Sequence, residues 1–130
     1  MSARRVEERY AKLTDALDRF GEVLARDASD DVVRDASIQR FEFTFELFWK
    51  ALKADLEQRG RSAGPSPRDV IRAAYQGGWL DEEKPFLDMI DDRNVTSHTY
   101  KEELAREVFA RLPGHYALLR RALTDRAAST

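Results

Sequence analysis

The chain has 130 residues, of which 42% are hydrophobic and 35% are charged, and its formal net charge is −2. This length fits one domain, residues 1–130, and the charge argues against a general nucleic-acid coat protein while allowing a small local site. The absence of cysteine excludes disulfides, thiolate catalysis and zinc–thiolate sites. Because there is neither a long apolar run nor a signal-peptide pattern, we expect a cytoplasmic protein with no membrane partner.

Two long helices are predicted in the first half of the chain. Residues 3–26 carry an apolar stripe with alternating steps of four and three, formed by Val6, Tyr10, Leu13, Leu17, Phe20 and Leu24. Residues 31–59 contain a short stretch of period-two alternation around Phe43, but the wider window keeps helical steps and no turn residue interrupts it. The apolar surface of this second helix exceeds one stripe, which indicates a central helix that also packs on a second chain.

Two shorter helices and a fifth long one follow. Ser66 and Pro67 give a start signal for a third helix, which should end at the glycine pair 77–78. Asp81 is expected to cap a fourth helix over about 82–94, and residues 95–98 are expected to form a tight connection. A fifth helix should follow, kinked or broken at Pro113, with residues 127–130 as a frayed tail. The fold class is therefore all-α, an up-and-down bundle of four to five helices.

The segment from Arg93 to Tyr100 is the candidate functional site. Arginine presents a permanently charged planar donor fork that suits phosphate, and histidine exchanges protons near neutral pH. Cleavage of RNA by its own 2′-hydroxyl needs little more than such a pair, so Arg93 and His98 are catalytic candidates, with Ser97 or Thr96 adding a hydrogen bond. A non-catalytic interpretation stays open, because arginine is favoured near helix C-termini and a histidine in a turn is commonly just solvated.

Other polar groups give weaker signals. Asp88, Asp91 and Asp92 are more simply explained as solvated or paired with Arg93 than as a metal site, so we predict neither a metal nor a cofactor. Two glutamates of the second helix, residues 42 and 46, lie one turn apart and are either partners of Arg93 or His98 or exposed. His115, next to a glycine, is expected to be incidental.

Three blocks of sequence, residues 40–47, 66–71 and 91–100, together resemble the nucleotidyltransferase substrate-binding protein family of the HEPN superfamily of small helical bundles. The resemblance extends from the first helix to about Leu123. It implies a HEPN-like fold, a homodimer and a complex with a minimal nucleotidyltransferase. Many HEPN proteins are metal-independent ribonucleases with an arginine followed after four to six residues by a histidine, and Arg93 and His98 match that pattern.

The resemblance also implies roles for neighbouring residues. In related toxin–antitoxin pairs the nucleotidyltransferase transfers AMP to a tyrosine two residues after the histidine and so silences the ribonuclease, and Tyr100 matches that position. Asn94 matches the polar residue that often follows the arginine, so Asn94 and Ser97 are expected to bind substrate. The leading hypothesis is a toxin-like ribonuclease acting on RNA. The alternatives are a non-catalytic subunit that binds a nucleotide or substrate for the partner, and a purely structural helical dimer.

Overall fold

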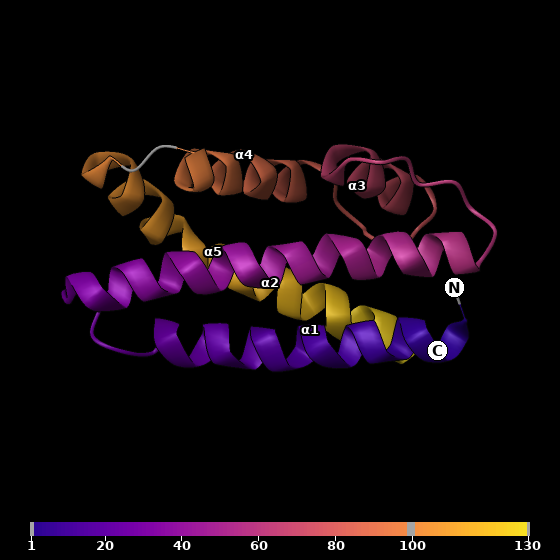
Figure 1. Ribbon diagram of the computed structural model, residues 1–130, viewed down its shortest axis with the longest axis horizontal. Coiled ribbons are helices and arrows are strands. Elements are labelled where there is room, and N and C mark those ends of the chain that lie inside the picture. Colours follow the sequence, from indigo (N-terminus) through magenta and orange to yellow (C-terminus); the bar gives the residue numbers. More distant parts are fainter. Residues whose placement is uncertain (1, 99–100, 130) are drawn as a thin grey trace.

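The computed structural model describes residues 2–98 and 101–129 (Figure 1). These residues form five α-helices and no strand, which confirms the all-α prediction. The helices are α1 (Ala3–Leu24), α2 (Asp31–Gln58), α3 (Pro67–Gln76), α4 (Lys84–His98) and α5 (Glu102–Ser129).

The starts of α2 and α3 follow the signals in the sequence. The Asp30 side chain accepts a hydrogen bond from the amide of Val32 at 2.8 Å, and Ser66 accepts one from the amide of Asp69 at 3.2 Å. Pro67 occupies the first helical position of α3, where its missing N–H would have no intrahelical partner anyway. Local capping therefore sets where both helices begin.

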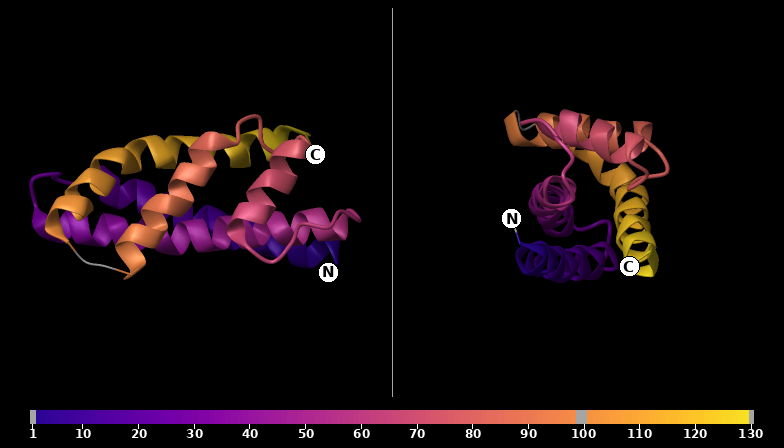
Figure 2. Two further views of the ribbon diagram at one scale, coloured as in Figure 1. Left: turned by 90° about the horizontal axis from the view of Figure 1, so that it is seen from above. Right: turned by 90° about the vertical axis from the view of Figure 1, so that its right-hand side faces the viewer.

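Helix α2 is central, as its wide apolar surface predicted. It contacts each of the other four helices. Figure 1 shows α1 running antiparallel to α2, and the right-hand view of Figure 2 shows α2 between α1 and the layer formed by α3 and α4. Helix α5 covers one side of α2. Phe43 of α2 is exposed and lines a groove with residues of α1. The left-hand view of Figure 2 shows that α3 and α4 cross α2 obliquely.

Aromatic side chains from α1 and α2 form the centre of the core. Fully buried phenylalanines continue along the inner face of α2, and they are joined by Phe20 of α1 and Phe86 of α4. The rings of Phe48 and Phe86 are stacked, with centroids 5.6 Å apart and an interplanar angle of 13°. Tightly packed interiors of this kind hold each helix at a fixed rotation about its axis, and this rotation sets the direction of its polar residues.

One buried carboxylate connects the C-terminal ends of α2 and α5 with the first half of α1. Asp55, only 1% exposed, accepts hydrogen bonds from Tyr10 Oη at 2.9 Å, Trp79 Nε1 at 3.1 Å and Arg126 Nε at 3.0 Å. Arg59 donates a further bond at 3.1 Å. Burial alone would raise the pKa of Asp55, but the bonds from Arg126, Arg59 and Tyr10 outweigh it and lower the pKa below its usual value.

Helix α5 differs from the predicted pattern. It continues through Pro113 without a break and reaches Ser129, beyond Ala127 where we expected fraying. Figure 2 shows that it bends along its length, which agrees with the predicted kink and with the backbone hydrogen bond that proline cannot donate. Leu112 and Leu119, both fully buried, fix the helix on either side of Pro113. Among the described residues, no helix is sufficiently long and apolar to traverse a bilayer.

Candidate functional site

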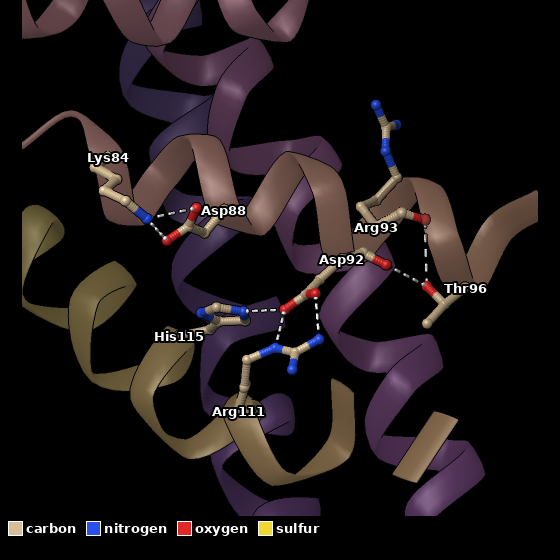
Figure 3. Close-up of polar contacts among 7 residues, drawn as sticks. All are labelled: Lys84, Asp88, Asp92, Arg93, Thr96, Arg111 and His115. Atoms are coloured by element: carbon tan, nitrogen blue, oxygen red, sulfur yellow. Dashed lines mark hydrogen bonds and ion pairs between the residues drawn. The ribbon is translucent and has the colours of Figure 1, made fainter. Parts of the chain in front are cut away.

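The segment that carries the candidate residues is helical. Helix α4 extends to His98, so the tight connection predicted for residues 95–98 is wrong. No glycine or proline interrupts this stretch, and the Thr96 hydroxyl lies 3.1 Å from the carbonyl oxygen of Asp92 and 3.2 Å from that of Arg93. Figure 3 shows both contacts on the last turns of α4. The start of α4 also differs, because the helix begins at Lys84 rather than at about residue 82.

Helical geometry separates the candidate positions into two faces. Residues four apart lie almost in line along a helix, whereas residues five apart diverge by roughly 140° around its axis. Positions 93 and 97 therefore share one face of α4, and positions 94 and 98 share a neighbouring one. Positions 93 and 98 belong to one continuous helix, so the backbone places them on different faces of α4.

Arg93 and Ser97 are held by two carboxylates of α2. An Nη1 atom of Arg93 donates to Glu46, and the Ser97 hydroxyl donates to Glu42. The two glutamates lie one turn apart on α2, which matches the one-turn spacing of Arg93 and Ser97 on α4. Glu46 is thus a partner of Arg93, as one of the two alternatives predicted, whereas Glu42 pairs with Ser97 rather than with Arg93 or His98. The Nε atom of Arg93 is buried and has no hydrogen-bond partner among the described residues.

The remaining candidates are placed only in part. Asn94 is exposed, and so is Ser97. The backbone of His98 ends α4, while its side chain lies outside the described part of the structure, as does all of Tyr100. The roles predicted for these residues therefore stay predictions.

A pocket of about 340 Å³ lies beside this segment, between α2, the last turns of α4 and the start of α5. Val95 and Thr96 line it from α4, and Glu42, the partner of Ser97, lines it from α2. Glu42 therefore contacts both the pocket and the face of α4 that carries Arg93 and Ser97.

Next to Arg93 in the sequence, Asp92 belongs to a polar network with α5 that the sequence did not indicate. Asp92 is buried and accepts two bonds from Arg111, from Nη2 at 2.7 Å and from Nε at 3.0 Å. The Nε2 atom of His115 lies 2.7 Å from the same carboxylate, and its ring is stacked on Phe41 at 5.3 Å. Figure 3 shows Asp92 directed toward α5 and Arg93 directed away from it. This network fixes the rotation of α4 against α5 and α2.

The environment of Asp92 keeps it ionised. Burial would raise the pKa of this carboxyl, but the hydrogen bonds from His115 and Arg111, with the charge of Arg111, lower it below its usual value. His115 is therefore not incidental. Its place on the buried stripe between Leu112 and Leu119 was the available signal in the sequence.

The three aspartates of α4 have separate partners. Asp88 pairs with Lys84 at 3.0 Å, Asp91 with Arg68 at 3.5 Å, and Asp92 with the α5 network rather than with Arg93. Within the described ranges, no group of three or more histidines and carboxylates is arranged to hold a metal ion.

Comparison with known proteins identifies the family of the chain. A family model described as "Nucleotidyltransferase substrate binding protein like" matches residues 8–129. The chain belongs to this family. The match includes the whole of α2, α3 and α4 and all but the first residues of α1, so it confirms the family indicated by the three blocks of sequence.

Two solved structures and one curated protein are similar to the chain. A crystal structure of a protein from Thermus thermophilus is 46% identical, has a TM-score of 0.79, and is matched over 87% of this chain and 97% of that one. HI0074 from Haemophilus influenzae is 23% identical with a TM-score of 0.66, over 95% and 98% of the two chains; it is described as revealing the fold of a substrate binding domain of a nucleotidyltransferase. At that identity the likeness establishes the fold.

The curated relative is "Probable ribonuclease HepT" from Haemophilus influenzae. It is 32% identical over 94 residues, which are 66% of this chain and 64% of that protein. The aligned region thus covers less than two thirds of the relative's length.

Proposed function

We propose that this protein is the ribonuclease subunit of a two-protein module whose other member is a minimal nucleotidyltransferase. In this proposal Arg93 binds the scissile phosphate of an RNA and His98 is the general acid or base. Asn94 and Ser97 contact the substrate, and no metal takes part. The similarity to a protein named as a ribonuclease supports the activity, and the family description supports the partner.

The observation that carries the proposal is the state of Arg93. Its side chain is only 21% exposed, is paired with Glu46 through Nη1, and has a buried Nε without a partner among the described residues. An arginine with a donor that has no partner among the described residues is a suitable binding group for a phosphate, which competes with Glu46 for the same fork. Replacing Glu46 with glutamine therefore frees Arg93 and tightens phosphate binding.

We further propose that the protein works as a homodimer that meets across the outer face of α2. Phe43 lies on that face, is 57% exposed, and lines one groove together with Leu47. The groove beside Phe43 carries Arg40, Arg19, Asp15 and Glu22, so two copies related by a two-fold axis can pair opposite charges. Such a dimer brings two Arg93 sites toward one shared surface.

Regulation in this proposal takes place at Tyr100, to which the partner transfers AMP. Transfer forms a bond between the tyrosine oxygen and the α-phosphorus of ATP, and pyrophosphate leaves. The expected result is a gain of one adenylyl group or more on the peptide that contains Tyr100, measured by mass spectrometry after incubation with ATP and the partner. The Tyr100→Phe variant is the matched control and should gain no mass.

Growth measurements test the toxin-like activity. Expression of the wild type alone should slow growth of a bacterial host, whereas His98→Ala at equal protein level should not. If the wild type is harmless and leaves RNA intact, the ribonuclease function is contradicted.

A second function is favoured by one specific observation. Arg93 is already neutralised by Glu46 and lies on a different helical face from position 98, which suits binding better than concerted acid–base chemistry. The protein would then be a non-catalytic subunit that binds a nucleotide or substrate for its partner, as the description of HI0074 suggests for that protein. Under this function Arg93→Ala abolishes ligand binding and no RNA cleavage is detected with any variant.

A further inference from the structure

The pocket beside the Arg93–Ser97 face has a floor and a rim of different chemistry. Its floor is aliphatic and comes from all three surrounding helices, through Ile38, Val95, Leu104 and Ala105. Its rim is polar and includes Asp35, Gln39, Glu42 and Lys101. A volume of about 340 Å³ lies at the lower end of the range for small-molecule sites, roughly 300–1,000 Å³, and suits a single planar ring system.

We propose that this pocket binds one nucleobase of the strand whose phosphate lies at Arg93, and that it selects bases with an exocyclic amino group. The proposal rests on the proposed function insofar as the ligand is a nucleic acid. It adds the part of the substrate that is recognised and the residues that recognise it.

The chemistry of the rim determines the preference. Asp35 and Glu42 carry carboxylates, which when ionised accept hydrogen bonds and donate none. Cytosine, adenine and guanine each offer an amino group to such an acceptor, whereas uracil offers two carbonyl oxygens and one ring N–H between them. A uracil therefore brings at least one carbonyl oxygen toward a carboxylate, and it loses the contact that cytosine gains. The aliphatic floor offers no hydrogen-bonding side chain and therefore does not discriminate between bases.

The position of the pocket connects the base to the phosphate site. Glu42 lines the pocket and accepts from Ser97, and Glu46 lies one turn further along α2 and accepts from Arg93. One helical turn is about 5.4 Å, a separation that a single nucleotide spans between its base and its phosphate. Lys101, directly before α5, adds a cation to the same rim for the sugar–phosphate backbone.

The test compares two ligands that differ at one position. Isothermal titration of the full-length protein with cytidine 5′-monophosphate and uridine 5′-monophosphate should give affinities that differ by roughly tenfold or more in favour of cytidine, the discrimination expected of one well-made base contact. The adenosine and guanosine monophosphates should group with cytidine. Equal affinities for the two pyrimidines, or no binding of any nucleotide at millimolar concentration, would overturn the proposal.

Variants locate the binding in the pocket. Leu104→Phe fills the floor of the pocket and should lower the affinity for cytidine 5′-monophosphate at least tenfold. Glu103→Gln, at an exposed neighbouring position that does not line the pocket, should leave this affinity unchanged. If Leu104→Phe does not fold, as shown by circular dichroism, Asp35→Asn at the exposed rim replaces it and should reduce the cytidine preference. Unchanged binding in a folded Leu104→Phe protein would contradict the assignment.

The two levels of the proposal fail separately. If the protein cleaves RNA but does not discriminate between the nucleotides, the proposed base pocket is contradicted and the proposed ribonuclease activity is retained. If the protein discriminates between the pyrimidine nucleotides but does not cleave RNA, the proposed base pocket is retained and the proposed ribonuclease activity is contradicted.

Discussion

Replacing Asp92 with alanine tests whether its network with α5 holds α4 in place. The change removes the acceptor of two bonds from Arg111 and one from His115. His115 is buried, so its ring nitrogen loses its partner inside the core at a cost of about 1–3 kcal/mol. The side chain of Arg111 is half-exposed, so water can replace its lost bonds and its part of the stability loss is small.

The expected loss of unfolding free energy is about 2–3 kcal/mol, below the roughly 3–5 kcal/mol of a fully buried pair from which one partner is removed. For a chain of this size that is a decrease in Tm of roughly 6–12 °C. Asp91→Ala is the matched control, because it makes the same substitution one residue away at an exposed position whose partner, Arg68, lies at 3.5 Å. It should change stability by no more than about 0.5 kcal/mol.

The difference between wild type and Asp92→Ala should also depend on pH. The pKa of Asp92 is lower in the folded protein than in the unfolded chain. The stability that Asp92 contributes is therefore fully present above the pKa that Asp92 has in the unfolded chain, and it is lost as pH falls through the pKa that Asp92 has in the folded protein. Urea denaturation followed by circular dichroism should therefore show the full difference at about pH 5 and a smaller one at about pH 3. An Asp92→Ala protein as stable as Asp91→Ala, or a difference that is constant over this range, would refute the reasoning.

Three further changes test the packing. Pro113→Ala restores a backbone donor at an exposed position inside α5 and should stabilise the protein by about 1–3 kcal/mol in urea denaturation; a loss of stability would mean that the bend itself is required. Gly21→Ala places a Cβ 2.7 Å from the Tyr116 hydroxyl and should lower stability by about 1–3 kcal/mol despite the better helix propensity, and an unchanged midpoint would contradict this close packing. Phe43→Glu should convert a dimer into a folded monomer in light scattering, and a dimer that persists would exclude this face of α2 as the interface.

Much of the fold is encoded locally and could be predicted from the sequence. The starts of α2 and α3 depend on Asp30 and Ser66, whose capping bonds span two or three residues. The central place of α2 followed from the width of its apolar surface. Such features need no knowledge of distant parts of the chain.

The differences arise where long-range contacts outweigh the local signal. Small polar residues after Asn94 predicted a turn, but α4 continues because Asp92 is anchored to α5, Thr96 bonds back to the helix, and Ser97 reaches α2. A proline and a glycine predicted a possible break in α5, yet buried neighbours on both sides hold the helix together.

For the candidate site, the sequence indicated a segment of the chain but not its geometry. The spacing of Arg93 and His98 identified the segment, and the sequence offered Glu42 and Glu46 as possible partners. It did not indicate which glutamate pairs with which residue, because that depends on the register of α2 against α4. Asp55 shows the same limit, since its donors come from four separate parts of the chain.

The most direct test of the proposed ribonuclease is cleavage of a labelled RNA by the purified protein in buffer with excess EDTA. The proposal predicts cleavage by the wild type and a loss of about 10²–10⁴-fold in His98→Ala, the usual contribution of a general acid or base. Asp91→Ala, at an exposed position of the same helix, is the control and should retain the activity of the wild type. Absence of cleavage by the wild type, or equal cleavage by His98→Ala, would contradict the proposal.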